Sequence, residues 1–481
     1  MSGSGQSHKT SNQGFKASWV YAMAVGSAVG WGAFVLPYEW LLSSGLIAVV
    51  AGFVIGTLLV GVIAINYGYA TRSLPVTGGG IAFALATFGR VHGFIAGWAL
   101  MLGYMGIIAL NASAVTLVLR LVIPDMMMQG ALYEISGWTV YAPEVLVASL
   151  FLVGFAYLNI KNTAISGRVQ VLAVVLMLLA VATVLFGTGI HYVTHQERLP
   201  LLPPDGVGFW SAVGAIVAFA PWAYVGFDGI PQLAGEFRFS ANKIMRLLVG
   251  SIVSASFLYV AVILSAAFAL GGQMASFAGS SWEIGHAISS VMGRFGLVLM
   301  VLSVSMGVLT GLNGFYVAAS RVILTLSRSQ MLPASLGRLH PIYGTPSYAF
   351  YVVMAVCLIS PWFGRAALLW IVDMTSVGIA VTFFYTCACA YKLGRDGVVF
   401  GMSVQQKSNA QRIIGILGMV ISVGFLLLLL LPNSAGALSL PSRYMLVLWV
   451  LLGILFYVVR RADLYRTSDA ELRQVLFDQV Y

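Results

Sequence analysis

The chain has 481 residues, of which 60% are hydrophobic and only 8% are charged, whereas a soluble domain carries about 25% charged residues. This composition excludes a water-soluble fold, and the long apolar runs exclude a membrane β-barrel, whose short strands alternate in polarity. The net charge of +10 lies in loops between the runs, so membrane topology accounts for it better than binding to nucleic acid does.

Twelve apolar runs follow one another along the chain, and we predict that each forms a transmembrane helix. The third and eighth runs are long, which predicts tilted helices. The approximate bounds are 17–39, 46–70, 92–121, 142–160, 168–190, 209–233, 247–271, 289–326, 347–362, 366–391, 412–432 and 442–460. The sequence therefore predicts an all-α polytopic membrane protein with polar tails at 1–16 and 461–481.

Lysine and arginine are distributed unevenly between the two sides of the predicted helices. If the N-terminus lies in the cytoplasm, 20 of the 25 Lys and Arg residues fall on the cytoplasmic side, as the positive-inside rule requires. We therefore expect a multi-pass protein of the cell membrane with both termini in the cytoplasm.

The first predicted helix is interrupted near its middle by the sequence GSAVGWGAF, residues 26–34. Each glycine costs up to about 1 kcal/mol relative to alanine inside a helix, and an unpaired backbone group costs several kcal/mol more in lipid. Glycine also permits close packing between membrane helices. Taken alone, the stretch fits either a helix break or a tight helix contact.

The sixth predicted helix carries a matching interruption in AIVAFAPWAYVGFDGIPQ, residues 215–232. Pro221 removes a backbone donor, and Gly226 and Gly229 loosen the turns that follow it. Two interrupted helices that lie five helices apart favour two five-helix repeats of inverted topology, a 5+5 arrangement. We place the repeats at 17–190 and 209–391, with discontinuous helices 1 and 6 facing each other, and helices 11 and 12 at 412–460 as additions.

A broken helix has chemically useful ends inside the membrane. Its outer half would begin near Gly30 and Gly32 with free N–H groups and a partial positive charge, which suits a carboxylate. Its inner half would end near Ser27 and Ala28 with free carbonyl groups, which suit an ammonium group. An α-amino acid carries both groups at that separation.

Five segments in chain order resemble amino acid permeases of the amino acid–polyamine–organocation superfamily. They are VGWGAFVLP (29–37), YATRSLPVTGGGIAFA (69–84), WAYVGFD (222–228), AGEFRFSANKI (234–244), and SRVILTLSRSQMLP (320–333) followed by YGTP (343–346). The fourth segment lacks the proline usual in that family. The resemblance spans residues 18 to 395 and implies the leucine-transporter-type fold with alternating access.

The resemblance also implies roles for individual residues. Backbone N–H groups near Trp31, Gly32 and Ala33 would hold the substrate carboxylate. Carbonyl groups near Ala28 and Val225 would hold its amino group. Trp222 matches an aromatic residue that covers the substrate from the extracellular side in some members. We expect two neighbours on helix 6 to belong to the same site, Phe219 and Ala223.

Four polar residues within the predicted helices are candidates for function. Asp228 on helix 6 and Asp373 on helix 10 are candidates for proton coupling, because a carboxylate in the bilayer is costly and must face protein or water. A structural role, pairing with backbone donors, is the alternative for each. Tyr104 on helix 3 and Asn313 on helix 8 could line the substrate pocket or join helices.

A coupling cation is the remaining open question. Some relatives carry a lysine on helix 5 at a position that matches Met177 here, so lysine-based coupling is not expected. A sodium site would need hydroxyl groups of helix 8, and Ser303, Ser305 and Thr310 are candidates, although such hydroxyls often bond to their own backbone.

The TGGG at 77–80 lacks the GK[ST] of a phosphate loop, which argues against an ATP-driven pump. The sequence shows no catalytic constellation, and we expect neither a metal nor another cofactor. The expected function is secondary active transport of a small amino acid, by proton symport or by exchange. The alternatives are transport of an amine such as ethanolamine or a polyamine and, from other classes, a channel or a membrane-embedded enzyme. The sequence does not indicate an oligomeric state.

Overall fold

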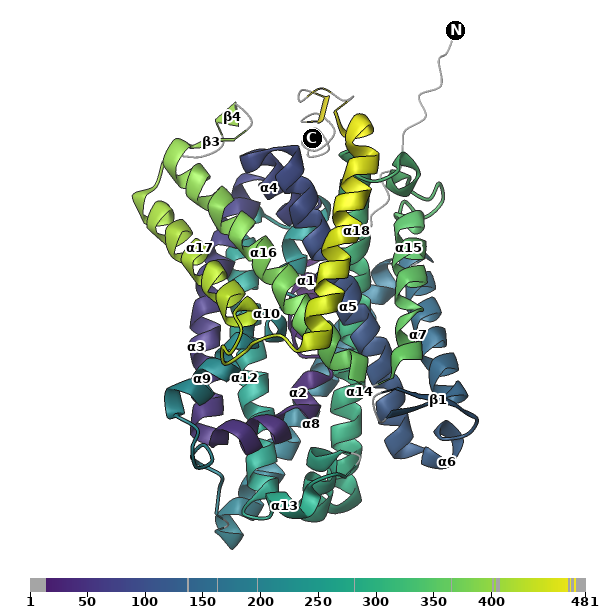
Figure 1. Ribbon diagram of the computed structural model, residues 1–481, viewed down its shortest axis with the longest axis vertical. Helices are drawn as coiled ribbons and strands as arrows, with labels where there is room; N and C mark the ends of the chain where they lie inside the picture. The colour runs from purple at the N-terminus through teal and green to yellow at the C-terminus, as the bar shows by residue number, and fades with distance from the viewer. Residues whose placement is uncertain are drawn as a thin grey trace.

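The computed structural model of the protein describes residues 14–472, except 136–137, 162, 197, 281, 365, 400–401, 404–406, 466–467 and 469–470. The predicted N-terminal tail therefore lies outside the described residues up to residue 13, as does most of the predicted C-terminal tail. The described chain is a bundle of long helices (Figure 1), which confirms the predicted all-α polytopic class.

Within the described residues, nine helices are long and apolar enough to cross a membrane. They are α3 (Pro37–Ser73), α5 (Arg90–Val122), α7 (Ala142–Lys161), α8 (Thr163–His195), α12 (Ile244–Leu270), α14 (Glu283–Arg328), α16 (Ala366–Asp396), α17 (Asn409–Leu430) and α18 (Leu440–Leu464). Three shorter apolar segments accompany them: α4 (Gly79–Phe88), α9 (Phe209–Ala218), and α15 (Ser347–Cys357) with the 3₁₀ helix η4 (Ser360–Phe363).

All twelve predicted runs are helical in the structure. The first and the sixth run are each divided into several short helices. The first run comprises α1 (Ala17–Ala28), α2 (Gly32–Val35) and the start of α3. The sixth comprises α9, α10 (Ala220–Ala223) and α11 (Gly229–Gln232). Both helices for which the sequence predicts a break are thus discontinuous.

Gly45 separates the first run from the second within α3. Its φ of 69° lies in the left-handed region that glycine favours, and a Cβ there would overlap the backbone of Leu202. The loop beside it pairs with the helix, since the N–H of Leu46 donates to the carbonyl of Pro200 at 2.7 Å. The turn between the first two spans is therefore fixed by a backbone contact that needs glycine.

Two features of the helices are not predicted from the sequence. Gly293, with φ 63° and ψ −155°, divides α14 into two helices, so the first residues of the eighth run belong to a separate helix from the rest of the run. The loop expected between the second and third runs contains the short helix α4, whose N-cap Gly78 has a φ of 81°.

The remaining elements are short pieces outside the main helices: α6 (Pro124–Met127), α13 (Met274–Phe277), η1 (Ala234–Glu236), η2 (Ala241–Lys243), η3 (Ala334–Gly337), and the antiparallel pairs β1 (Ala131–Ile135) with β2 (Trp138–Tyr141) and β3 (Val398–Val399) with β4 (Met402–Ser403).

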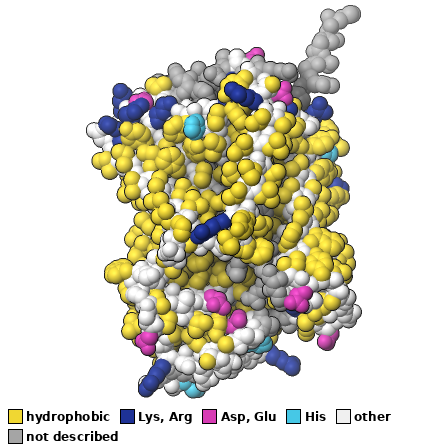
Figure 2. Space-filling view, in the orientation of Figure 1, with side chains coloured by type: hydrophobic (Ala, Val, Ile, Leu, Met, Phe, Trp, Pro, Cys, Tyr) yellow, Lys and Arg dark blue, Asp and Glu magenta, His cyan; other side chains and the backbone are white. Residues whose placement is uncertain are grey.

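The two ends of the bundle differ in charge. Figure 1 shows α4, β3 and β4 at one end and α6, α13 and β1 at the other. On the face drawn in Figure 2, most Lys and Arg side chains gather at the first end and most Asp and Glu side chains at the second, with a largely hydrophobic surface between them. This arrangement is the one that the positive-inside rule expects of a membrane protein.

A nearly buried ion pair holds several elements together at the end of the bundle where most Asp and Glu side chains gather. Arg120 of α5 donates from Nε and Nη2 to the two carboxylate oxygens of Glu144 in α7, at 2.6 and 2.7 Å. Nη2 also donates to the carbonyl of Thr139 in β2 at 3.0 Å, and the guanidinium lies 4.1 Å from the ring centroid of Trp138. The pair thus ties α5, α7 and the β1–β2 hairpin together.

Replacing Glu144 with alanine will destabilise the fold, because Arg120 is left buried without its counter-charge. Loss of one partner of such a pair costs about 3 kcal/mol, which unfolding in mixed detergent–lipid micelles measures. Glu134→Ala on the exposed strand β1 is the matched control. Equal stability of the two variants would contradict a structural role for the pair.

Candidate functional site

The two helix breaks touch each other in the middle of the bundle. Gly226, between α10 and α11, has a φ of 129°, and a Cβ there would lie 2.8 Å from Cβ of Ser27 and 2.9 Å from the backbone N of Ala28. Only glycine permits this approach, since its φ and the available space both exclude a side chain. The end of α1 therefore packs directly against the backbone of helix 6.

The outer half of helix 1 begins with unpaired backbone donors. No hydrogen bond to another described residue engages the N–H groups of Gly30, Trp31 or Gly32, whereas the N–H of Ala33 donates to the carbonyl of Gly30 at 3.2 Å. The indole of Trp222 lies against Gly32 so closely that a Cβ on Gly32 would overlap it. Gly32 is thus covered by an aromatic ring from helix 6.

The carbonyl groups at the breaks divide into occupied and free ones. The hydroxyl of Tyr259 in α12 donates to the carbonyl of Ala28 at 3.1 Å, and that of Thr310 in α14 donates to the carbonyl of Gly26 at 3.0 Å. The carbonyls of Ser27 and Val225 accept no hydrogen bond from the described part of the chain. The expected acceptor Ala28 is therefore already engaged, and Ser27 and Val225 are among the open acceptors.

Asp228 is fully buried directly after the helix 6 break. Its Oδ1 accepts from the N–H of Gly226 at 2.8 Å, and its Oδ2 accepts from the hydroxyl of Tyr104 at 2.7 Å. The carboxylate thus satisfies a backbone donor freed by the break and links helix 6 to α5. Tyr104 contacts this region through Asp228 and so joins α5 to helix 6, one of the two roles that the sequence leaves open for it.

Asn111 is a buried residue near the break that the sequence analysis did not select. It lies on α5 two helical turns beyond Tyr104, and its Nδ2 donates to the carbonyl of Ile107 at 3.0 Å. Its Oδ1 has no partner among the described residues and lies 3.2 Å from the position of a Cβ on Gly30. One buried acceptor therefore faces the helix 1 break without a protein donor.

Trp31 turns away from helix 6. It borders a cavity of about 430 Å³ on the side of α6 and the β1–β2 hairpin, together with Arg120, Trp138, Trp282 and His286. Trp282 donates from its indole N–H to the carbonyl of Phe34 at 3.0 Å, which fixes α2 to the start of α14. Trp31 thus forms the wall between this cavity and the breaks.

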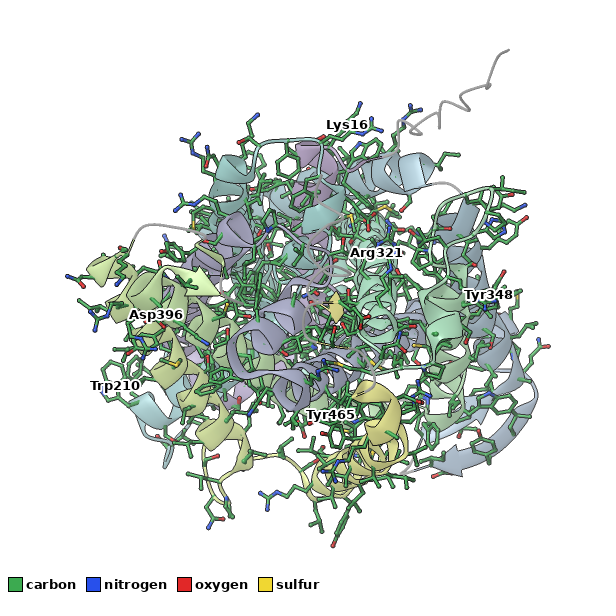
Figure 3. All side chains as sticks on the ribbon, turned by 90° about the horizontal axis from the view of Figure 1, so that it is seen from above. Lys16, Trp210, Arg321, Tyr348, Asp396 and Tyr465 are labelled. Atoms are coloured by element: carbon green, nitrogen blue, oxygen red, sulfur yellow. The ribbon has the colours of Figure 1, made fainter. Side chains whose placement is uncertain are left out.

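The N-terminal segment packs against the chain after helix 6, on the side away from this cavity. Phe15, which the sequence analysis assigned to a polar tail, is 1% exposed and pairs with the backbone of Glu236 and Arg238 at 3.0 and 3.1 Å. Arg321 of α14 forms an ion pair with Glu236 at 2.9 Å, and Figure 3, seen from this end, labels Arg321 near the middle of the bundle. The described conformation is closed here and has its larger cavity on the far side.

Several predicted site residues lie elsewhere. Asn313 is bonded to helices α7 and α8 through Asn159, Ser166 and Gln170, at 2.8 to 2.9 Å, so its side chain joins helices and leaves no polar atom for a substrate. Phe219 points its ring toward Trp40 of α3, with ring centroids 6.0 Å apart.

Asp373 is also outside the site, at the far end of α16. Its Oδ2 accepts from the backbone N–H of Ser439 at 3.2 Å and from the hydroxyl of Ser442 at 2.7 Å. The carboxylate therefore caps the first turn of α18, the structural alternative for this residue. Ala223 is buried in α10 beside Trp222.

The hydroxyl groups proposed for sodium are mostly engaged. Ser303 donates to the carbonyl of Leu299 in its own helix at 2.8 Å, and Thr310 donates to helix 1 and to its own helix. Ser305 is half-buried and has no hydrogen bond to a described residue. Met177 is fully buried near Gly307, where the helix 1 break passes α14.

Two discontinuous helices with unpaired backbone groups at their contact define a class of membrane transporter. The family profile of amino acid permeases matches residues 16–456, and the chain belongs to this family. It is therefore a multi-pass membrane transporter and not an enzyme.

Curated relatives agree with this assignment. The chain is 25% identical to a branched-chain amino acid permease, BcaP, of Lactococcus lactis subsp. cremoris over 78% of this chain and 80% of the relative. It is 27% identical to the BcaP of Bacillus subtilis, over 70% and 72% of the two chains. A glutamate/serine transporter of Bacillus subtilis, AimA, is 24% identical over 70% and 63%.

Gly32→Val is expected to nearly abolish uptake of the substrate, because its side chain occupies the approach to the free N–H groups of helix 1. Gly154→Val is the matched control, since no atom lies within 4 Å of a Cβ at Gly154. Trp222→Ala removes the ring that a side chain at position 32 overlaps. If that second change restores uptake to Gly32→Val, the defect is a packing clash and the N–H groups are not the binding site.

Proposed function

We propose that the protein is a secondary active transporter that moves a small amino acid across the cell membrane by alternating access. The observation that carries the proposal is the contact of two broken helices with unpaired N–H groups on one side and unpaired carbonyl groups on the other. Oppositely polarised groups a few ångströms apart suit a zwitterion better than an ion of single charge. The relatives named for branched-chain amino acids support the substrate class.

In the proposed complex, the carboxylate accepts hydrogen bonds from the N–H groups of Gly30, Trp31 and Gly32. The ammonium group donates to the carbonyls of Ser27 and Val225. Charge-assisted hydrogen bonds of this kind contribute about 1.5–3 kcal/mol each when they are protected from water. Trp222 must move its ring from Gly32 to admit the carboxylate, and it then covers the substrate.

Asp228 is proposed to carry the coupling proton. Protonation would weaken its acceptance of the Gly226 N–H and so loosen the turn that packs on helix 1, which links a proton to the shape of the site. Exchange of one substrate for another, without net proton movement, is the alternative mode. Both oxygens of Asp228 already accept hydrogen bonds, so direct pairing with the amine of a polyamine or ethanolamine has less support.

Movement of the two five-helix repeats would expose the site to each side of the membrane in turn. Residues 17–190 and 209–391 are taken as inverted repeats that rock against each other, supported by the matching breaks in their first helices. The Lys- and Arg-rich end is taken as cytoplasmic, so the segment around Phe15 closes the inward side. Opening inward then requires release of this segment and of the Arg321–Glu236 pair.

The test of the function uses purified protein in liposomes and a panel of labelled amino acids and amines. We expect concentrative uptake of a small apolar amino acid driven by an inward proton gradient, and counterflow when substrate is loaded inside. Uptake of amines alone would favour the amine alternative. Rapid flux without counterflow would indicate a channel.

Asp228→Asn is expected to remove the dependence of uptake on external pH while leaving counterflow measurable, because the amide cannot exchange a proton. Asp205→Asn, in an exposed loop, is the control. Initial rates between pH 5 and 8 provide the measurement. A pH profile identical to that of the unaltered protein would remove Asp228 from proton coupling.

Asn111→Leu is expected to raise the KM for the amino acid about tenfold, which corresponds to about 1.4 kcal/mol for one lost hydrogen bond in a buried site. Oδ1 of Asn111 is an unpaired acceptor beside the helix 1 break, and we expect it to accept a hydrogen bond from the ammonium group of the substrate. Ser113→Ala on the same helix also removes a buried, unpartnered oxygen, but one that borders a separate small cavity. An unchanged KM in Asn111→Leu would exclude this residue from the site.

A further inference from the structure

A second cavity, of about 300 Å³, lies between α5, α16 and α18, and none of its lining residues belongs to helix 1 or helix 6. Its walls are hydrophobic and include Trp98, Leu102, Val381, Trp449, Val450 and Tyr457. It opens sideways, since Val450 is 49% and Ile95 40% exposed. This groove belongs to the largely hydrophobic face in Figure 2, where α18 crosses the front of the bundle in Figure 1.

The groove exists because α18 is packed only sparsely. Along α18 the buried residues are Ser442, Gly453 and Leu464. Near Gly453 the indole N–H groups of two tryptophans are both hydrogen-bonded. Trp98 Nε1 donates to the backbone carbonyl of Trp449 at 3.0 Å, and Trp449 Nε1 donates to the backbone carbonyl of Trp98 at 3.3 Å. The two rings stack with centroids 4.9 Å apart. Their polar atoms are used, so they offer the groove apolar faces.

The groove has the length of one leaflet of a bilayer. On α18 it extends from Leu446 to Tyr457, which is about 16 Å at a rise of about 1.5 Å per residue. One leaflet contributes about 15 Å of hydrocarbon. On α18 the groove occupies the middle of the helix, and on α5 it extends to Val91, next to Arg90, which donates to the carbonyl of Leu464 at the end of α18.

Beyond Tyr457, the last residue of the groove on α18, basic residues lie at the end of this helix. Arg90 donates to the carbonyl of Leu464 and lies 5.7 Å from the ring centroid of Tyr465, and Figure 3 shows Tyr465 at the end of α18 on the edge of the bundle. Arg460 pairs with Asp463 at 2.6 Å. Arg461 is exposed and forms no ion pair within the described part of the chain. Arg461 thus adds at headgroup level a guanidinium group that has no counter-charge among the described residues.

We propose that this groove binds one acyl chain of an anionic phospholipid from the leaflet at the end of α18, with the lipid phosphate at Arg461. The apolar walls match the chain, the length matches one leaflet, and the unpaired guanidinium matches the phosphate. Basic residues at the membrane surface attract anionic lipid by about 1 kcal/mol each. The site is separate from the transport pathway and does not depend on which substrate is carried.

Native mass spectrometry of the purified full chain tests the proposal, with phosphatidylglycerol and phosphatidylethanolamine of equal chain length as probes. We expect one tightly retained phosphatidylglycerol per protein. Val450→Trp, which fills the groove, should lower retention about tenfold, and Ala99→Phe from the opposite wall should do the same. Leu451→Trp, on the neighbouring exposed face of α18, should retain the lipid.

The headgroup arm uses Arg461→Gln. This variant should lower phosphatidylglycerol retention about fivefold and bring it to the level of phosphatidylethanolamine. Equal retention in Val450→Trp and Leu451→Trp would overturn the groove as the site. Equal retention of the two lipids by the unaltered protein would overturn the anionic headgroup, and a dimer that Val450→Trp dissociates would show that a second copy of the chain covers the groove instead.

Discussion

The fold depends on one constraint: inside a bilayer, every backbone N–H and C=O group must find its partner within the protein. In helices 1 and 6 the regular backbone hydrogen bonds are interrupted near the middle of the helix. The surrounding helices must therefore supply partners for the backbone groups that are left unpaired. Tyr259 and Thr310 donate to two carbonyls of α1, and Asp228 accepts the N–H of Gly226. The groups that remain include the N–H groups of Gly30 to Gly32 and the carbonyls of Ser27 and Val225, which are available to a ligand.

The same constraint explains why side chains around the breaks have restricted roles. Asp228 cannot act as a free carboxylate, because it also holds a backbone donor and the hydroxyl of Tyr104. A proton on Asp228 would weaken its hydrogen bond to the N–H of Gly226. This change would alter the helix 6 turn and, because Gly226 packs on α1, the position of α1 as well. Trp31 and Trp222 stand on opposite sides of the break, one toward the large outer cavity and one over Gly32. The glycines allow the two backbones to meet.

The sequence predicts the helical class, the twelve runs and both helix breaks, because composition, Gly and Pro act locally. It does not predict the kink at Gly293 or the close turn at Gly45, since glycine occurs throughout these helices and only tertiary contacts show which ones bend. The sequence leaves two roles open for Asp373 and for Asn313, and the structure shows the structural one in each case, since Asp373 caps α18 and Asn313 joins α7 and α8. Asn111 was missed because its importance lies in an unpaired oxygen, which depends on three helices at once.

The central claim is that backbone groups of the helix 1 break recognise the carboxylate of an amino acid. Calorimetric titration of the purified protein with the best transported amino acid and with its decarboxylated amine tests this claim most directly. Loss of several charge-assisted hydrogen bonds predicts that the amine binds about 100-fold more weakly, if at all. Equal affinity for the two compounds would contradict the account.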